Sequence, residues 1–184
     1  MQELFFIAIL PPLAISNDID EIRKQCSAQY QVYSALKPPV HITLIPPFKL
    51  EPRQKNRLIS SLEHCRHFHP FVQELRNYDG FPLKVVYINA VKNPGIIALH
   101  KMLRENLKIF LKENSSSINP HITIAYRDVT ETIFDQIMKV YSKRRFHALF
   151  TVDKFTLLKH DGKKWNILKE FESRPEKEQY TMDL

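Results

Sequence analysis

The chain repeats its own order of segments after 80 residues, and this duplication restricts the fold more than any other feature of the sequence. Patterns typical of strand, helix, strand, helix and strand follow one another over residues 1–80, and the same order returns over 81–172. A repeat of this length is too long for a solenoid and indicates duplication of one αβ unit. We therefore predict one domain over 1–172, built as two lobes around an approximate twofold axis. The alternative is that the two halves are unrelated and that their alternating elements follow the same order by chance.

The first half contains recognisable start signals for its elements. The apolar run 4–10 predicts a buried strand that Pro11 ends, and Asp18 with Glu21 three residues later forms a capping box that predicts a helix beginning at Asp18. A strand over 40–50, a helix beginning at Pro52 and a strand over 71–78 complete this half.

The second half repeats this order and adds a hairpin. We predict a strand over 83–91, a helix from Pro94, a strand over 121–127 and a helix capped by Thr130. Segments 147–158 and 165–171 are expected to pair around the turn Asp161-Gly162. The polar tail 173–184 is expected to lie outside the domain.

Composition places the chain among compact proteins with anionic partners. There are 27 Lys and Arg against 20 Asp and Glu, and this formal charge of +7 favours phosphate-rich ligands. The basic residues are spread along the sequence, so charge alone does not define a polynucleotide groove. Only two cysteines, Cys26 and Cys65, are present, which favours the cytoplasm. No apolar run is long enough for a membrane span.

The tripeptide His-Ile-Thr occurs twice, as His41-Ile42-Thr43 and as His121-Ile122-Thr123. With 8 His and 7 Thr in 184 residues, chance would place a histidine two residues before a threonine only about 0.3 times. One copy would mean little. Two copies at matched positions of a repeat indicate a shared function.

The spacing brings histidine and threonine to the same side of a strand, because residues i and i+2 point to one face. If the two strands face one cleft, two imidazoles and two hydroxyls converge on a space suited to a phosphate. One imidazole can then take a proton while the other donates one, and the hydroxyls can hydrogen-bond phosphate oxygens. The alternative for each motif is a half-buried strand whose histidine is satisfied by ordinary hydrogen bonds.

Two His-x-Thr segments about eighty residues apart in a basic chain of this size resemble the 2H phosphoesterases, which include bacterial 2′-5′ RNA ligases and 2′,3′-cyclic phosphodiesterases. The resemblance covers nearly the whole chain and is specific at the two motifs. It implies an α+β fold in which the duplicated unit forms two lobes with antiparallel sheets, helices outside and an active cleft between the lobes.

The resemblance also implies roles for the motif residues. His41 would donate a proton to the leaving oxygen, His121 would accept one from the attacking water or hydroxyl, and Thr43 and Thr123 would orient the phosphate. Neither a metal nor a cofactor is expected. The partners implied are an RNA terminus or a cyclic nucleotide, without a membrane or an obligate protein partner.

Three further residues are candidates for substrate binding. Many members of the family carry a basic residue five positions after the second histidine, where this chain has Tyr126, and Arg127 follows at the sixth. Strand alternation would place Arg127 on the face of His121, although a solvated strand end is the alternative. Phe48 would stack on a base at the cleft rim, or else pack in the core.

A second histidine-rich segment allows a different reading. Residues 64–69 contain three histidines and a cysteine at the end of a predicted helix, but no further ligand group at zinc-site spacing accompanies them. A metal hydrolase built on this segment would be revealed by chelator sensitivity. The other competing function is a catalytically silent module that binds RNA ends.

Overall fold

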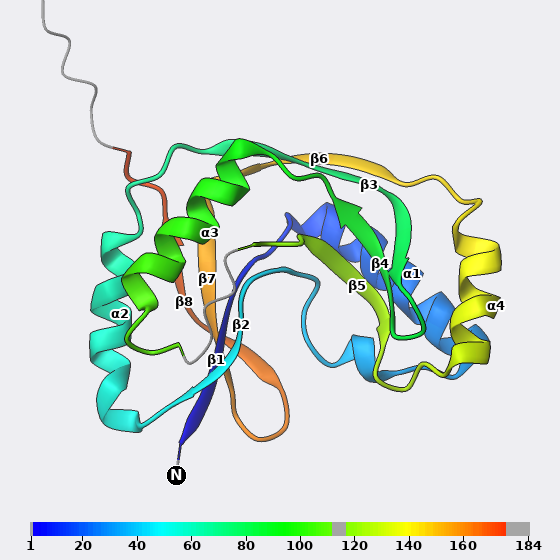
Figure 1. The fold of residues 1–184 in the computed structure, drawn as a ribbon, viewed down its shortest axis with the longest axis horizontal. Helices are drawn as coiled ribbons and strands as arrows, with labels where there is room; N and C mark the ends of the chain where they lie inside the picture. Colours follow the sequence, from blue (N-terminus) through cyan, green and yellow to red (C-terminus); the bar gives the residue numbers. More distant parts are fainter. Residues whose placement is uncertain (1, 112–116, 176–184) are drawn as a thin grey trace, which may run out of the picture.

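A computed structural model describes residues 2–111 and 117–175, and its elements follow the order in Figure 1. The strands are β1 (Glu3–Ile9), β2 (Ile42–Leu50), β3 (Phe71–Phe81), β4 (Val85–Ala90), β5 (His121–Tyr126), β6 (His147–Val152), β7 (Lys154–His160) and β8 (Trp165–Glu172). The helices are α1 (Leu13–Tyr30), α2 (Lys55–His64), α3 (Pro94–Leu107) and α4 (Glu131–Tyr141), with short 3-10 turns η1 (Ser34–Leu36) and η2 (Pro52–Gln54).

The strands form two four-stranded antiparallel sheets, which confirms the predicted α+β fold class. The first sheet has the order β2-β1-β7-β8 and the second the order β5-β4-β3-β6. The first sheet therefore contains strands from both ends of the chain, whereas the second is built from its middle. The two lobes do not correspond to the two halves of the sequence, because β3 leaves the first half to pair with β4.

The helices also cross between the lobes. Helix α1 follows β1 of the first sheet but packs against β5 of the second, and α3 follows β4 of the second sheet but packs against β2 of the first. Figure 1 shows α2 and α3 beside one sheet and α1 and α4 beside the other. Buried apolar side chains from all four helices and from both sheets together form one large core.

The inner strand β1 is buried on both faces, as its continuous apolar run predicts. One face joins the main core through Phe5 and Ile7, while Phe6 and Ala8 on the other face form a small cluster with Leu158 of β7. Trp165 packs on this second cluster. The first sheet thus presents an apolar, aromatic surface on the side away from its main core.

Three details of the predicted elements are wrong. Helix α1 begins at Leu13, directly after the prolines, so Asp18 is an exposed residue inside the helix and not its cap. The predicted strand 147–158 is broken at Asp153, where the chain passes from β6 in one sheet to β7 in the other. The tail begins in contact with the domain, because the Ser173 amide donates to Asp153 and the Arg174 amide to Arg66. Residues 176–184 lie outside the described residues.

The start signals of the later helices are confirmed. Asn93 accepts a hydrogen bond from the Ile96 amide at the start of α3, with Pro94 in the first turn, and Thr130 accepts one from the Ile133 amide at the start of α4. These caps fix where each helix leaves its neighbouring strand.

Candidate active site

The two His-x-Thr segments lie at the edges of the two sheets. Strands β2 and β5 are the outermost strands of their sheets and contact each other across the lobes. Each strand contains a bulge directly after its threonine: Leu44 has no partner between the pairs Ala8–Thr43 and Ile7–Ile45, and Ile124 is skipped in the same way opposite β4. The equivalent irregularity in both strands supports the internal repeat.

The bulges change the alternation of the strands after the motifs. Leu44 and Ile45 are both buried, and so are Ile124 and Ala125. A regular strand would turn one residue of each pair outward. The next residue in β5 that is partly exposed is therefore Tyr126, five positions after His121.

Both histidines are held by the same hydrogen bond. The Nδ1 atom of His41 lies 2.7 Å from the carbonyl oxygen of Pro39, and the Nδ1 atom of His121 lies 2.7 Å from that of Asn119. A carbonyl oxygen can only accept, so Nδ1 carries the proton in both rings. Each neutral ring therefore has its free lone pair on Nε2, and Nε2 is the atom available for proton transfer.

Aromatic rings fix the planes of both imidazoles. The His41 ring lies 4.9 Å from the Phe6 ring, and the His121 ring lies 5.0 Å from Tyr87 and 5.1 Å from Phe81, measured between centroids. Phe6 and Tyr87 lie in β1 and β4, the strands that pair with β2 and β5. Phe81 lies at the end of β3, which forms a hairpin with β4. Packing and the Nδ1 hydrogen bond together leave each imidazole little rotational freedom.

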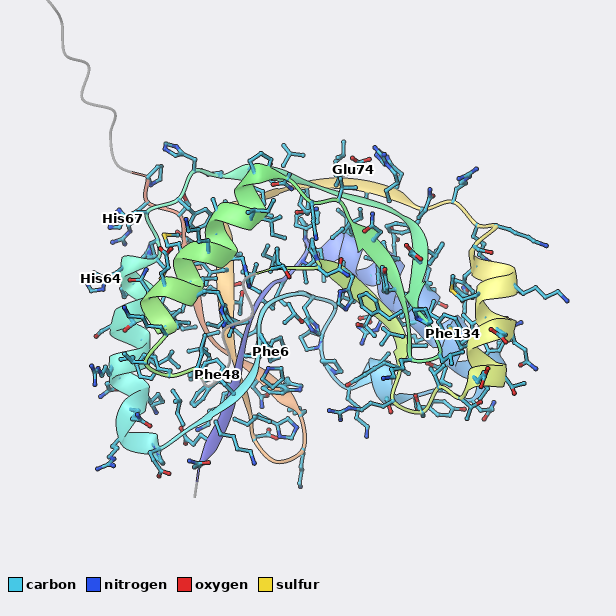
Figure 2. All side chains as sticks on the ribbon, viewed as in Figure 1. Phe6, Phe48, His64, His67, Glu74 and Phe134 are labelled. Carbon is cyan, nitrogen blue, oxygen red and sulfur yellow. The ribbon has the colours of Figure 1, made fainter. Side chains whose placement is uncertain are left out.

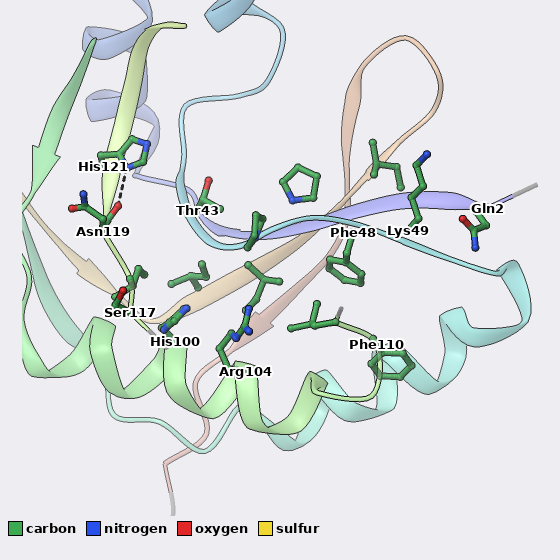
Figure 3. A pocket seen from close by; sticks show the side chains of 17 residues that line it. Gln2, Thr43, Phe48, Lys49, His100, Arg104, Phe110, Ser117, Asn119 and His121 are labelled. Carbon is green, nitrogen blue, oxygen red and sulfur yellow. Dashed lines mark hydrogen bonds between the residues drawn. The ribbon is translucent and has the colours of Figure 1, made fainter. Parts of the chain in front are cut away.

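The motif side chains line two cavities that meet at Thr43. A cavity of about 430 Å³, which we call the His41 cavity, contains His41, Thr43 and Thr123. A second cavity of about 630 Å³, the His121 cavity, contains Thr43 and His121 (Figure 3). His41 and His121 therefore line different cavities, which share Thr43.

Burial disfavours the charged form of both imidazoles. It lowers the pKa of His41 to about 4; the hydrogen bond to Pro39 opposes this effect, and the positive charge of Arg23 adds to it. Burial also lowers the pKa of His121, against the opposing effect of its hydrogen bond to Asn119. In the protein without substrate both rings are neutral at pH 7.

We expect this burial to make the fold sensitive to acid. An unfolded histidine titrates near 6.5, whereas folded His41 stays neutral down to about pH 4. Between these values the unfolded chain binds more protons, so the free energy of unfolding should fall as the pH decreases, by about 1–3 kcal/mol for this residue. Urea unfolding at pH 7 and pH 4.5 measures the loss. The His41→Gln variant should lose less stability than the parent, and an equal loss would contradict the assignment.

Comparison with known proteins identifies the family. The family model described as the 2′-5′ RNA ligase superfamily matches residues 11–164. The chain belongs to this superfamily of 2H phosphoesterases. A search of curated proteins found no match.

Solved structures share the superfamily fold. Escherichia coli LigT complexed with 3′-AMP matches with a TM-score of 0.66 and 21% identity, covering 94% of this chain and 99% of LigT. The protein TT0787 of Thermus thermophilus matches with a TM-score of 0.65 and 23% identity, covering 96% and 100%. LigT without ligand gives 0.64 and 21% identity over 94% and 98%. At these identities the matches show a common fold.

Tyr126 stands five residues after His121, at the position where many family members have a basic residue. Because of the bulge, Tyr126 keeps the cleft side of β5, and the prediction that alternation carries Arg127 to the face of His121 is wrong. Arg127 follows the strand with φ of 65° and places its guanidinium 5.2 Å from the centre of the Tyr126 ring. Both residues line the His41 cavity, so the arginine reaches the cleft by a backbone turn.

Phe48 takes part in both of its predicted environments. Its ring lies 6.1 Å from the core residue Phe5, and the side chain also lines the His121 cavity. Figure 2 shows Phe48 and Phe6 in the middle of the molecule, with His64 and His67 on its outer side near α2.

Within the residues that the structure describes, the histidine-rich segment 64–69 is not part of a group that could hold a metal ion. His64 Nδ1 bonds the Ser60 carbonyl, His67 Nδ1 bonds the Arg174 carbonyl, and Cys65 is buried. Across residues 2–111 and 117–175, no three His, Cys, Asp or Glu side chains are grouped to hold a metal ion. In the same part of the chain, no helix is long and apolar enough to cross a membrane.

Sequence reasoning missed Arg23, which lies in α1 and lines the His41 cavity. Its side chain is 2% exposed, and it donates from one terminal nitrogen to Pro38 O at 2.9 Å and from the other to Asp20 at 3.1 Å. Pro38 precedes Pro39, whose carbonyl holds His41. Arg23 thus anchors the segment that orients His41. Sequence periodicity marked this position only as part of a helix, since a buried arginine leaves no apolar signal.

Proposed function

We propose that this protein is a metal-independent phosphoesterase that opens 2′,3′-cyclic phosphates of RNA or nucleotides to 2′-phosphates, or forms such 2′-phosphoester bonds in reverse. The observation that carries the proposal is the pair of identically held imidazoles, in which the Nδ1 hydrogen bond leaves the lone pair of each ring on Nε2. LigT, which shares the fold, has been solved with 3′-AMP, ATP, NADP+ and phosphate. We also expect the protein to work in the cytoplasm without an obligate protein partner.

The nucleoside would lie in the His41 cavity, because the leaving 3′ oxygen stays attached to it. His121 takes a proton from water as the water oxygen bonds to phosphorus. The bond from phosphorus to the 3′ oxygen breaks, and His41 supplies the proton to that oxygen. The hydroxyls of Thr43 and Thr123 donate to the non-bridging oxygens, where negative charge accumulates.

His41 must be protonated to act as the donor, but burial disfavours its charged form in the protein without substrate. A bound phosphate anion beside His41 favours the imidazolium and raises its pKa, so His41 would gain its proton together with the substrate. Both histidine pKa values are lowered in the free protein. The pH profile of kcat/KM should therefore have both limbs below 6.5, in place of limbs on either side of it, while the kcat profile extends to higher pH.

The bond that breaks gives the decisive test. Incubation with a 2′,3′-cyclic mononucleotide should yield the 2′-monophosphate, identified by phosphorus NMR or chromatography, with turnover unchanged by excess chelator. A 3′-monophosphate as the main product would reverse the roles of His41 and His121. RNA-end binding without turnover would favour the silent binding module, and activity that chelator removes and zinc or manganese restores would overturn metal independence.

A further inference from the structure

The turn that carries Arg127 has a backbone conformation that arginine rarely adopts. The amide of Asp128 donates to the carbonyl oxygen of Tyr126 at 2.8 Å and closes a three-residue turn with Arg127 at its centre. Arg127 has a φ of 65°, in the left-handed region that favours glycine. Such a backbone persists only where surrounding contacts hold it, and positions of this kind cluster at functional sites.

Asp128 supplies those contacts through two hydrogen bonds to a distant segment. Its carboxylate oxygen Oδ2 accepts from the amide of Tyr33 at 2.7 Å and from the amide of Ser34 at 2.9 Å, at the start of η1. These pairs lie 95 and 94 positions apart in the sequence. Desolvation raises the pKa of Asp128, but the amide hydrogen bonds outweigh this effect and lower it, so the acceptor is charged at neutral pH. Hydrogen bonds to a charged acceptor are the stronger kind.

The two segments that Asp128 joins form two walls of the His41 cavity. Arg127 follows β5 on one wall, and Lys37 follows η1 on the other. Asp128 itself does not line the cavity, and its carboxylate is held at the backbone of η1. A carboxylate free to turn would pair with the neighbouring arginine or repel a substrate phosphate. The two hydrogen bonds therefore leave the charge of Arg127 available to the cavity.

The anchor of His41 is separate from these hydrogen bonds. Arg23 donates to the carbonyl oxygen of Pro38, at the end of the segment that Asp128 holds at its start. Loss of the Asp128 carboxylate should therefore disturb the turn at Arg127 and leave the setting of His41 in place. Its effect on substrate binding should differ from its effect on proton transfer.

We infer that Asp128 is a positioning residue for the substrate, because its bonds to the start of η1 hold Arg127 in its turn and place the guanidinium for the substrate phosphate. This inference rests on the proposed function, since it takes the His41 cavity as the place of the nucleotide. Asp128 acts through Arg127 and does not itself touch the substrate.

The first test separates KM from kcat. Asp128→Ala should raise KM for a 2′,3′-cyclic mononucleotide by about threefold to tenfold and change kcat by less than about twofold, since a displaced arginine loses part of its hydrogen bonding to the phosphate. Asp128→Asn keeps an oxygen that can accept from both amides and should recover part of the loss. Asp135→Ala is the matched control, because it removes an exposed carboxylate from α4 and should change neither value.

A double-mutant cycle tests whether Asp128 acts through Arg127. In a chain that already carries Arg127→Ala, the further change Asp128→Ala should raise KM by less than about twofold. Hydrogen exchange followed by NMR should show faster exchange of the Tyr33 and Ser34 amides in Asp128→Ala, which verifies that their hydrogen bonds are lost. Because Asp128 is exposed, we expect these variants to fold.

Calorimetric binding of a nucleoside 2′-monophosphate repeats the comparison without turnover. Faster exchange of the two amides with unchanged KM and unchanged affinity would show that Asp128 serves the loop alone and would overturn the inference. Additive effects of the Asp128 and Arg127 substitutions would overturn it as well. Coupled effects on binding in a protein that does not hydrolyse the cyclic nucleotide would instead overturn the proposed reaction and leave the role of Asp128 standing.

Discussion

Replacement of His41 or His121 by alanine should lower kcat by about 10² to 10⁴-fold, the usual contribution of a positioned general acid or base. Each ring has its Nδ1 fixed by a carbonyl and lines a different cavity, so neither can substitute for the other from its own position. Thr43→Ala and Thr123→Ala should cost less, because each removes one hydrogen bond to the phosphate.

The loss must be separated from a loss of structure. His147→Ala is a suitable control, since this histidine is 60% exposed on β6 and pairs with Glu74 away from both cavities. Thermal unfolding of all variants should show that the motif variants remain folded at the assay temperature. Near-normal turnover of either motif variant on a confirmed substrate would contradict the paired acid and base.

Arg23→Met should lower kcat/KM by about 10 to 10²-fold without preventing folding, although Arg23 lies behind His41 and not at the phosphate. The variant removes the hydrogen bond to Pro38 that holds the segment before His41, and small displacements of a catalytic group cost this much. The fold should survive, because the methionine side chain has no polar group that needs a partner inside the protein. Asp20, the ion-pair partner of Arg23, is 42% exposed and can be solvated.

A change in the pH profile distinguishes positioning from simple destabilisation. The charge of Arg23 lowers the pKa of His41, so its removal should raise that pKa and move the corresponding limb to higher pH. Lys24→Met removes the same charge from an exposed neighbour on α1 and should change neither rate nor profile. Arg23→Lys should restore part of the pH profile. A uniform loss of rate with an unmoved profile would show that Arg23 serves the fold alone.

The sequence predicted the helices and strands more successfully than it predicted which of them pack together. Apolar periodicity located the strands and the buried face of α3, because burial imposes a period that single residues reveal. It missed the start of α1 at Leu13, since Pro12 begins the helix without a side-chain cap while Asp18 and Glu21 imitate one. The passage of β3 into the other sheet leaves no local signal, because strand pairing is decided between residues far apart in sequence.

The candidate site could be predicted where it repeats and not where it is irregular. His41 and His121 were visible because duplication made a weak motif informative. The cleft position of Tyr126 was not, because it depends on a bulge at Ile124 that the alternation of a regular strand cannot show. Arg23 approaches from a helix on the other lobe, and only the packed structure places it near His41.

The order in which the chain is synthesised bears on when the site can form. The inner pairing of the first sheet joins Leu4 to His160, so β1 leaves the ribosome long before its partner β7. Pairings between such distant residues slow folding, because the entropy of closing a long loop is lost before the stabilising contacts form. The second sheet, by contrast, spans a continuous stretch from β3 to β6 and can assemble first. His41 directly precedes β2 of the first sheet, so it would gain its final setting only after β7 has joined β1 in that sheet.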